Sequence, residues 1–256
     1  MSIPERSGGF VLIRYGWLVL DEFHKPSRLP SMEYWIMKCF LFAAIAASAI
    51  SAPAMASTYL AHSNYDNDID DWRVRDSVSG NISYFTPSWA PSGGVPTGHL
   101  EFADETPGGY MFEAPEHFHG DFSLALGNGG IFFDWKADMI MDDKRPGVSL
   151  YRDGVRLLGL GDFGLAENEW HHLDFAFDLS AGWLVDFGNG AQTATMDDIQ
   201  WVLEGVDDLR IVGETWTGIS ETTWLDNPTI YTNVPGPGAL ALLMSAGVFI
   251  RRRRRY

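Results

Sequence analysis

The sequence lacks disulfide cysteines and the common motifs of hydrolytic enzymes. Its single cysteine, Cys39, cannot form a disulfide within the chain. No G-x-S-x-G or H-E-x-x-H motif occurs. The adjacent His171 and His172 would point to opposite faces of a strand, so both rings cannot bind one metal ion. We therefore expect no catalytic residues, and a glycan-active enzyme is the least favoured class.

Positive charge is scarce in the central region of the chain. Residues 57–232 contain 30 Asp and Glu residues but only 8 Lys and Arg residues. Such an acidic surface repels nucleic-acid phosphates and anionic lipids, and it favours solubility or the binding of cations. Nucleic acid is therefore excluded as a partner.

Long hydrophobic runs are confined to the two ends of the sequence. Near the C-terminus, the apolar run 238–250 precedes five arginines. As a helix, this run would rise about 20 Å, which is less than the ~30 Å hydrocarbon core of a bilayer. It therefore predicts transient contact with a membrane during export, with the arginines held on the cytoplasmic side.

The C-terminal tail, 233–256, resembles the PEP-CTERM sorting tail of bacterial surface proteins. The resemblance rests on Val234, Pro235, Pro237 and the arginine cluster that begins at Arg251. It implies processing by an exosortase-like enzyme, although a glycine replaces the usual acidic residue between the two prolines. An ordinary C-terminal anchor or a frayed apolar tail is the alternative.

The N-terminal region predicts a secretory signal peptide at 37–56. A lysine is followed by the apolar segment 39–50 and by an A-x-A site formed by Ala54 and Ala56. Cleavage would leave 57–232 as one exported domain, destined for the cell envelope, the cell surface or an extracellular matrix. Residues 1–36 carry no recurring pattern, which indicates a mis-assigned start codon or a disordered leader.

Alternating hydrophobicity predicts an all-β fold for the central domain. Ile131, Phe133 and Trp135 form the expected core side of one strand, and Leu173 and Phe175 that of another. Short strands separated by glycine and proline turns favour an antiparallel β-sandwich of the jelly-roll, galactose-binding-like type.

Two local patterns refine this fold. Asp153-Gly154 separates two apolar segments and predicts a two-residue type I′ hairpin. Thr195 and Asp198 have the spacing of a capping box, which predicts one short helix packed across an end of the sandwich.

The order of landmarks along 70–231 resembles the laminin B module, also called laminin domain IV. This resemblance implies a matrix or surface protein with no general enzymatic activity. The residues that carry it are Gly93-Gly94, Gly98, Tyr110-Met111-Phe112, Ala114-Pro115, Phe118, Gly120-Asp121, the segment 131–135, Trp170, Asp198, Leu209-Arg210-Ile211, Gly213-Glu214 and Leu225-Asp226-Asn227.

An acidic cluster near the predicted mature N-terminus suggests calcium as a cofactor. Oxygen ligands of this kind suit calcium, but the spacing does not match the EF-hand loop. Galactose-binding-like sandwiches often bind calcium where the first loop meets the last strand. That resemblance implies a site formed by Asp68 and Asp70 with Glu221 or Asp226, and a solvated acidic loop is the alternative.

Aromatic residues in predicted loops suggest a carbohydrate-binding surface. We expect Trp89, Trp216 and Tyr84 to contact sugar rings, and we expect Phe85 and Trp224 to lie in the core. Two functions follow from these patterns. The chain is either a non-catalytic module that binds extracellular polysaccharide or a structural matrix protein that contacts other proteins without a small ligand.

Overall fold

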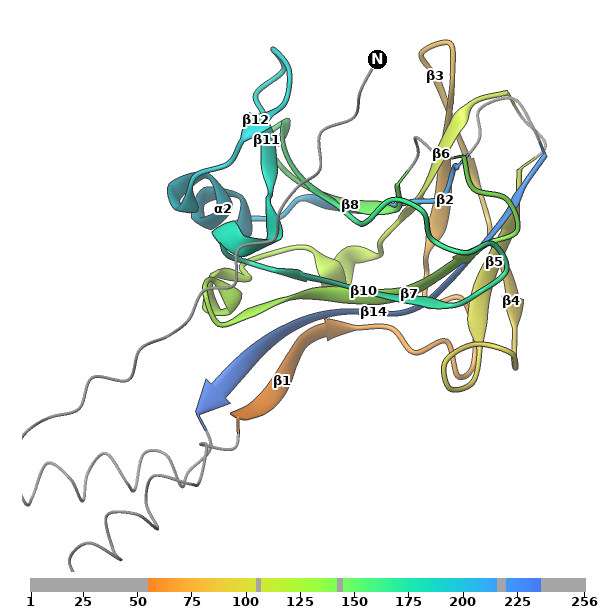
Figure 1. Cartoon of the computed structure of the whole chain (residues 1–256), viewed down its shortest axis with the longest axis horizontal. Coiled ribbons are helices and arrows are strands. Elements are labelled where there is room, and N and C mark those ends of the chain that lie inside the picture. Colours follow the sequence, from red (N-terminus) through yellow and green to blue (C-terminus); the bar gives the residue numbers. More distant parts are fainter. Residues whose placement is uncertain (1–54, 105–106, 142–144, 216–219, 236–256) are drawn as a thin grey trace, which may run out of the picture. The chain divides into compact units, whose positions relative to one another are not determined.

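Alternating apolar side chains build two antiparallel β-sheets that pack face to face (Figure 1). The computed structural model describes residues 55–104, 107–141, 145–215 and 220–235. Several predicted features lie outside these residues: Ala54, Trp216, Pro237, Arg251, the leader 1–36 and most of the signal and tail segments.

The first sheet has the strand order β10-β7-β14-β5-β4, and β1 also pairs with β14. The long strand β14 is therefore central, because β7 pairs along one of its edges while β5 and β1 share the other. The strands of this sheet are β1 (Met55–His62), β4 (Ser88–Ala90), β5 (His99–Ala103), β7 (Gly129–Ala137), β10 (His171–Ala176) and β14 (Thr222–Pro235).

The second sheet has the order β12-β11-β9-β8-β13-β6-β2-β3. Its strands are β2 (Arg73–Val78), β3 (Asn81–Phe85), β6 (Gly109–Glu113), β8 (Gly147–Arg152), β9 (Val155–Leu160), β11 (Leu184–Asp186), β12 (Gln192–Thr193) and β13 (Asp208–Val212). Three short 3₁₀ turns and one α-helix complete the described residues: η1 (Glu116–Phe118), η2 (Ser123–Ala125), η3 (Leu179–Ala181) and α2 (Met196–Leu203). The predicted antiparallel sandwich with one short helix is confirmed.

The core between the sheets is rich in aromatic side chains. Ile131, Phe133 and Trp135 are fully buried, as their alternation predicts. Buried indoles need a partner for their ring N–H. Trp135 Nε1 donates to the carbonyl of Val212 at 3.0 Å, and Trp183 Nε1 donates to that of Ala176 at 2.7 Å. These bonds let the two indoles fill the core with their ring N–H groups satisfied.

The two local predictions are also confirmed. Asp153 and Gly154 have φ angles of 49° and 79° at the turn between β8 and β9, as a type I′ turn requires. The Thr195 hydroxyl accepts a hydrogen bond from the Asp198 amide, and Asp198 in turn accepts from the amide of Thr195. This capping box fixes the start of α2.

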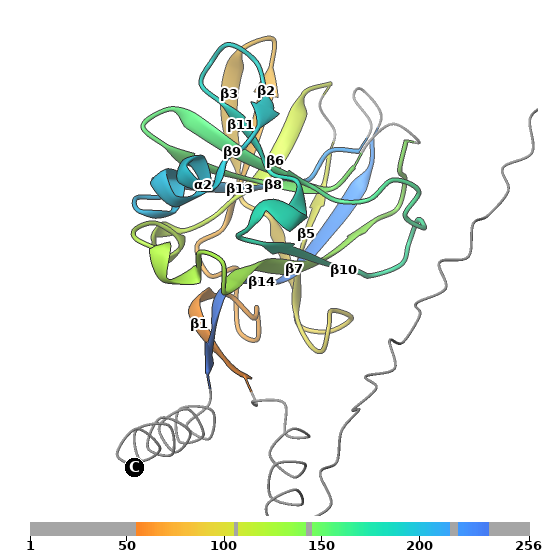
Figure 2. The ribbon, with the colours of Figure 1, turned by 60° about the vertical axis from the view of Figure 1, so that its left-hand side comes forward.

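The first and last described strands, β1 and β14, run side by side (Figure 2). Ala56 lies opposite Val234, and Ser57 lies opposite Asn233. The predicted signal-peptide cleavage site therefore falls within this ladder, next to the first residues of the predicted sorting tail. Among the described residues, no helix is long and apolar enough to cross a membrane.

Candidate functional site

The outer face of the first sheet carries a row of rings that point away from the core. Four adjacent strands each contribute one ring: Tyr59 from β1, Tyr231 from β14, Phe132 from β7 and His172 from β10. Phe132 is central, with centroid distances of 5.7 Å to Tyr231, 5.1 Å to His172 and 6.4 Å to Tyr59. Tyr59 is 57% exposed. We call these four residues the aromatic row.

An irregularity in the pairing of β14 with β7 assembles this row. Between Asp226 and Thr229, β14 has one residue more than its partner β7, and the register shifts. A second shift lies between Tyr59 and Ala61 in β1. Because side chains alternate between faces, one extra residue reverses the face of every side chain that follows. The first bulge therefore turns Tyr231 outward.

A wall stands beside the row, formed by the segment that precedes β5. Val95 donates its backbone N–H to Asp226 Oδ2 at 2.5 Å, and Asn227 donates its own N–H to Oδ1 at 2.8 Å. Trp170 Nε1 donates to the carbonyl of Gly93 at 3.0 Å. A pocket of about 450 Å³ lies between wall and row, lined by Tyr59, His62, Asn64, Asp66, Pro96, Thr97, Phe132 and Asn227. The aromatic row and this pocket together are called the tyrosine half of the face.

Carboxylates border the tyrosine half. The Tyr231 hydroxyl lies 3.1 and 3.2 Å from the two oxygens of Asp174, and the Thr97 hydroxyl donates to Asp66 at 2.6 Å. Burial and the Asp174 charge raise the pKa of Tyr231 to about 12, so this hydroxyl stays protonated and donates. Burial also raises the pKa of Asp226 to about 7. The half thus presents hydrogen-bonding groups and negative charge around flat apolar rings.

Beyond the wall, the same outer face has a tryptophan half, made of Trp170, Trp224, Lys136, His99 and Glu101. The Lys136 ammonium lies 4.0 Å from the ring centroid of Trp224 and 5.3 Å from that of Trp170. Trp224 Nε1 donates to Glu101 at 2.8 Å. The prediction that Trp224 lies in the core is wrong, because it points outward from β14 opposite Lys136. The rings of this half are already covered by a cation of the protein.

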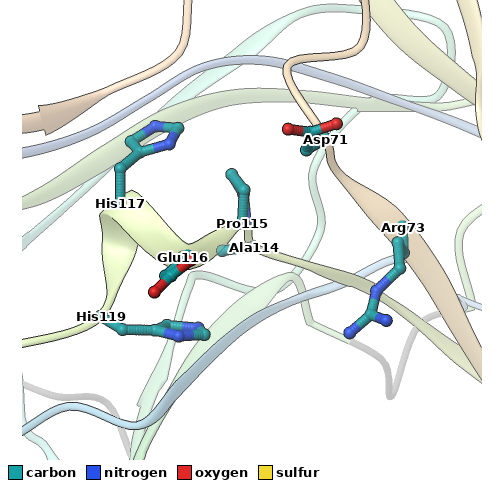
Figure 3. A pocket seen from close by; sticks show the side chains of 7 residues that line it. All are labelled: Asp71, Arg73, Ala114, Pro115, Glu116, His117 and His119. Atoms are coloured by element: carbon teal, nitrogen blue, oxygen red, sulfur yellow. The ribbon is translucent and has the colours of Figure 1, made fainter.

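A second pocket, of about 960 Å³, lies elsewhere and is lined by several charged side chains (Figure 3). Glu116, His117 and His119 reach it from η1 and the residue after it, while Asp71 and Arg73 face them across the pocket. Arg73 already forms an ion pair with Glu113. The described lining of this pocket contains no tyrosine, phenylalanine or tryptophan on which a sugar ring could stack.

Ser63, Asp70 and His117 meet nearby, yet they do not form a catalytic triad. The Ser63 hydroxyl donates to Asp70 at 2.5 Å and lies 3.4 Å from His117 Nε2. In a triad the hydroxyl would donate to the imidazole, which removes its proton. Ser63 is also only 2% exposed, so a substrate could not reach its oxygen.

The predicted ligand-binding residues do not gather in one place. Trp89 lies on β4 of the first sheet, and its Nε1 donates to the carbonyl of Tyr65 at 2.7 Å. Tyr84 is 53% exposed on β3 of the second sheet, where the Arg73 guanidinium covers its ring. Phe85 was expected in the core, but it is 39% exposed. Contact of Trp89, Trp216 and Tyr84 with sugar remains a prediction.

The structure separates two of the predicted calcium ligands, Glu221 and Asp226, which were alternatives for one position. Asp68 accepts from the Asp70 amide at 2.8 Å, so these two share one loop. Glu221 accepts from the Thr215 amide at 2.6 Å and lies five residues before Asp226, about 17 Å away along an extended strand. Glu221 therefore cannot share an ion with Asp226. Within the described part of the chain, no group of three or more His, Cys, Asp or Glu residues could hold a metal ion.

Sequence reasoning missed the aromatic row. Alternation placed Phe132 on the outward side of its strand, and an aromatic residue at an outward position was the available signal. The other rings come from distant segments, and only strand register brings them together.

No protein-family model and no curated protein matches this sequence. Among solved structures, the chain is similar to the L4b domain of human laminin alpha-2, at 9% identity and a TM-score of 0.49 over 71% of this chain and 98% of that domain. It is also similar to CtCBM11, at 13% identity and a TM-score of 0.42 over 72% of this chain and 99% of that one. A third is a xylan-binding domain from CBM 22, at 14% identity and a TM-score of 0.35 over 70% of this chain and 96% of that domain. These values transfer no ligand and no site to this chain.

Proposed function

We propose that this protein is an exported, non-catalytic module that binds extracellular polysaccharide on the tyrosine half of its outer sheet face. The aromatic row is the observation that carries this proposal. Sugar rings present flat apolar faces edged by hydroxyl groups, and they stack on aromatic rings flanked by polar side chains. Here the rings come from four paired strands, so the platform is held by the sheet rather than by loops.

Binding of the purified full-length chain to a panel of soluble polysaccharides tests this proposal. Tyr59→Ala should weaken binding about tenfold, because it removes a fully outward ring at modest cost to the fold. Phe163→Ala is the matched control, since Phe163 is also 57% exposed but lies outside the row. Equal losses in the two variants would contradict the proposed site.

The predicted residues define a second arm of the same experiment. This arm compares Tyr59→Ala with Trp89→Ala, Trp216→Ala and Tyr84→Phe. If any of these three weakens binding more than Tyr59→Ala does, the ligand binds outside the aromatic row. Binding repeated with a chelator tests calcium, which this proposal does not require. If no polysaccharide binds, the alternative of a matrix protein that contacts other proteins is favoured.

The export signals are part of the proposal and have their own test. Mass spectrometry of the protein produced by its native host should find a chain that begins at Ser57 and that lacks the apolar run 238–250. A chain that retains both ends would contradict export through the predicted signal peptide and an exosortase-like enzyme.

A further inference from the structure

Among the described residues, the tyrosine half differs from the tryptophan half, from Tyr84 and from Phe163 in having no lysine or arginine over its rings. Lys136 covers Trp224, Arg73 lies 4.7 Å from the ring of Tyr84, and Arg145 lies 4.3 Å from that of Phe163. Among the residues that the structure describes, no lysine or arginine lies over a ring of the aromatic row. Aromatic faces attract cations, so these rings offer a cation site that the protein itself does not fill.

Negative charge surrounds the same rings. Asp174 and Asp66 are exposed beside the row, and Asp134, two residues after Phe132 on β7, has an oxygen 2.9 Å from His172 Nδ1. Within the described ranges, neither Asp174 nor Asp66 pairs with a lysine or an arginine. No lysine or arginine lines the adjacent pocket either. Carboxylates beside uncovered rings attract an ammonium group and repel a carboxylate or a sulfate.

We propose that the polysaccharide bound here is an amino-sugar polymer with free, protonated amino groups. This inference rests on the proposed function and narrows its ligand. The sugar ring stacks on the aromatic row, and its ammonium group lies against the ring faces with Asp174 as its hydrogen-bond acceptor. A neutral sugar would stack on the rings without an ionic contact to the carboxylates. The carboxylates of a polyuronate would be repelled by those of the protein.

Calorimetric titration of the full-length chain with three oligosaccharides of equal length tests this inference. The three are a glucosamine oligomer, its fully N-acetylated form and an oligogalacturonate. At mildly acidic pH and low salt, where the amino groups of the sugar are protonated, the glucosamine oligomer should bind about tenfold more tightly than the acetylated form. The oligogalacturonate should not bind.

Two variants separate a specific site from general attraction to an acidic protein. Asp174→Asn should weaken binding of the glucosamine oligomer about fivefold and leave the acetylated form unchanged. Asp153→Asn removes one charge at the distant β8–β9 turn and should change neither affinity. Asn retains a side-chain oxygen that can accept from Tyr231, so the fold is preserved.

The outcomes distinguish the inference from the proposed function. Equal affinity for the acetylated and free-amine oligomers would overturn the inference while leaving polysaccharide binding intact. An equal loss in Asp153→Asn and Asp174→Asn would overturn it as well, since the attraction would then be unspecific. Binding that does not depend on Tyr59, or no binding to any glycan, would defeat the proposed function itself.

Discussion

The two halves of the outer sheet face surround their aromatic rings with charges of opposite sign. In the tryptophan half, Lys136 lies between two indoles, so the rings and the cation satisfy each other. In the tyrosine half, the rings have carboxylates around them and no lysine or arginine over them among the described residues. The difference shows that two groups of outward rings on one sheet face can differ in whether the protein itself places a cation over them.

The largest expected effect concerns the wall between the two halves, which Asp226 holds in place through hydrogen bonds. Asp226→Ala should lower the free energy of unfolding by about 3 kcal/mol, because it removes the buried carboxylate that accepts hydrogen bonds from the backbone N–H groups of Val95 and Asn227. Urea unfolding measures this loss. Asp162→Ala, at an exposed position, is the control, and a loss for Asp226→Ala no larger than the control would show that the wall does not need this carboxylate.

Equivalent truncations in the two halves sharpen the comparison directly. Phe132→Ala should cost about 2 kcal/mol of glycan-binding free energy, because Phe132 contacts the other three rings of the row. Trp224→Ala should leave glycan binding unchanged, because Lys136 already covers its ring. Calorimetry gives both values, with thermal unfolding as a check on the fold. Comparable losses in the two variants would mean that the ligand spans both halves.

A buried carboxyl at the start of β14, next to the tryptophan half, predicts the pH dependence of stability. Burial raises the pKa of Glu221 from 4.5 to about 7, and the nearby Glu214 and Asp104 charges add to this effect. The Thr215 hydroxyl has one proton but two acceptors, the Met139 carbonyl at 2.5 Å and Glu221 Oε2 at 2.7 Å. Protonated Glu221 supplies the missing donor, so the neutral form suits this site.

The sign of the effect follows from proton binding. Between about pH 4.5 and pH 7, the folded state holds a proton on Glu221 that the unfolded chain has lost, so the contribution of Glu221 to stability falls as pH rises through this range. Glu221→Gln should therefore stabilise the protein by about 1.5 kcal/mol above this range and change little below it. Urea unfolding at one pH below this range and one pH above it measures the stabilisation. Stabilisation of equal size at both pH values would contradict a raised pKa for Glu221.

The smallest expected effect comes from removing the Lys136 ammonium group from the tryptophan half. Lys136→Met should cost about 1 kcal/mol of stability, because the Trp170 and Trp224 faces lose their partner. It should also open a second, weak site for an amino sugar, which a titration detects as increased stoichiometry. Lys136→Arg keeps a cation there and should behave like the natural protein. If Lys136→Met gains no second site, uncovered rings alone do not recruit an ammonium group.

Much of the fold could be predicted from sequence, because local rules act within single segments. The alternation of Ile131, Phe133 and Trp135 matches their burial, and Asp153-Gly154 forms the expected turn. The wrong prediction that Trp224 lies in the core also came from a local rule. A large indole in a strand favours the core by its area, yet its position relative to Leu225 places it outside.

The candidate site could not be predicted in the same way. Simple alternation from Trp224 along β14 would place Tyr231 inward and Ile230 outward. The bulge between Asp226 and Thr229 reverses this order, because one extra residue inverts the faces that follow it. No short sequence motif predicts this bulge.

The sequence by itself determined the antiparallel sandwich, the acidic character of the central domain and the positions of the hairpin and the helix. These features depend on periodicity, composition and local capping, which act within a few residues. Only the tertiary structure decided which rings share a surface, because Tyr59, Phe132, His172 and Tyr231 meet through the register of four strands. It also decided which aromatic rings receive a cation from the protein, since Lys136 reaches Trp170 and Trp224 only across neighbouring segments of the sheet.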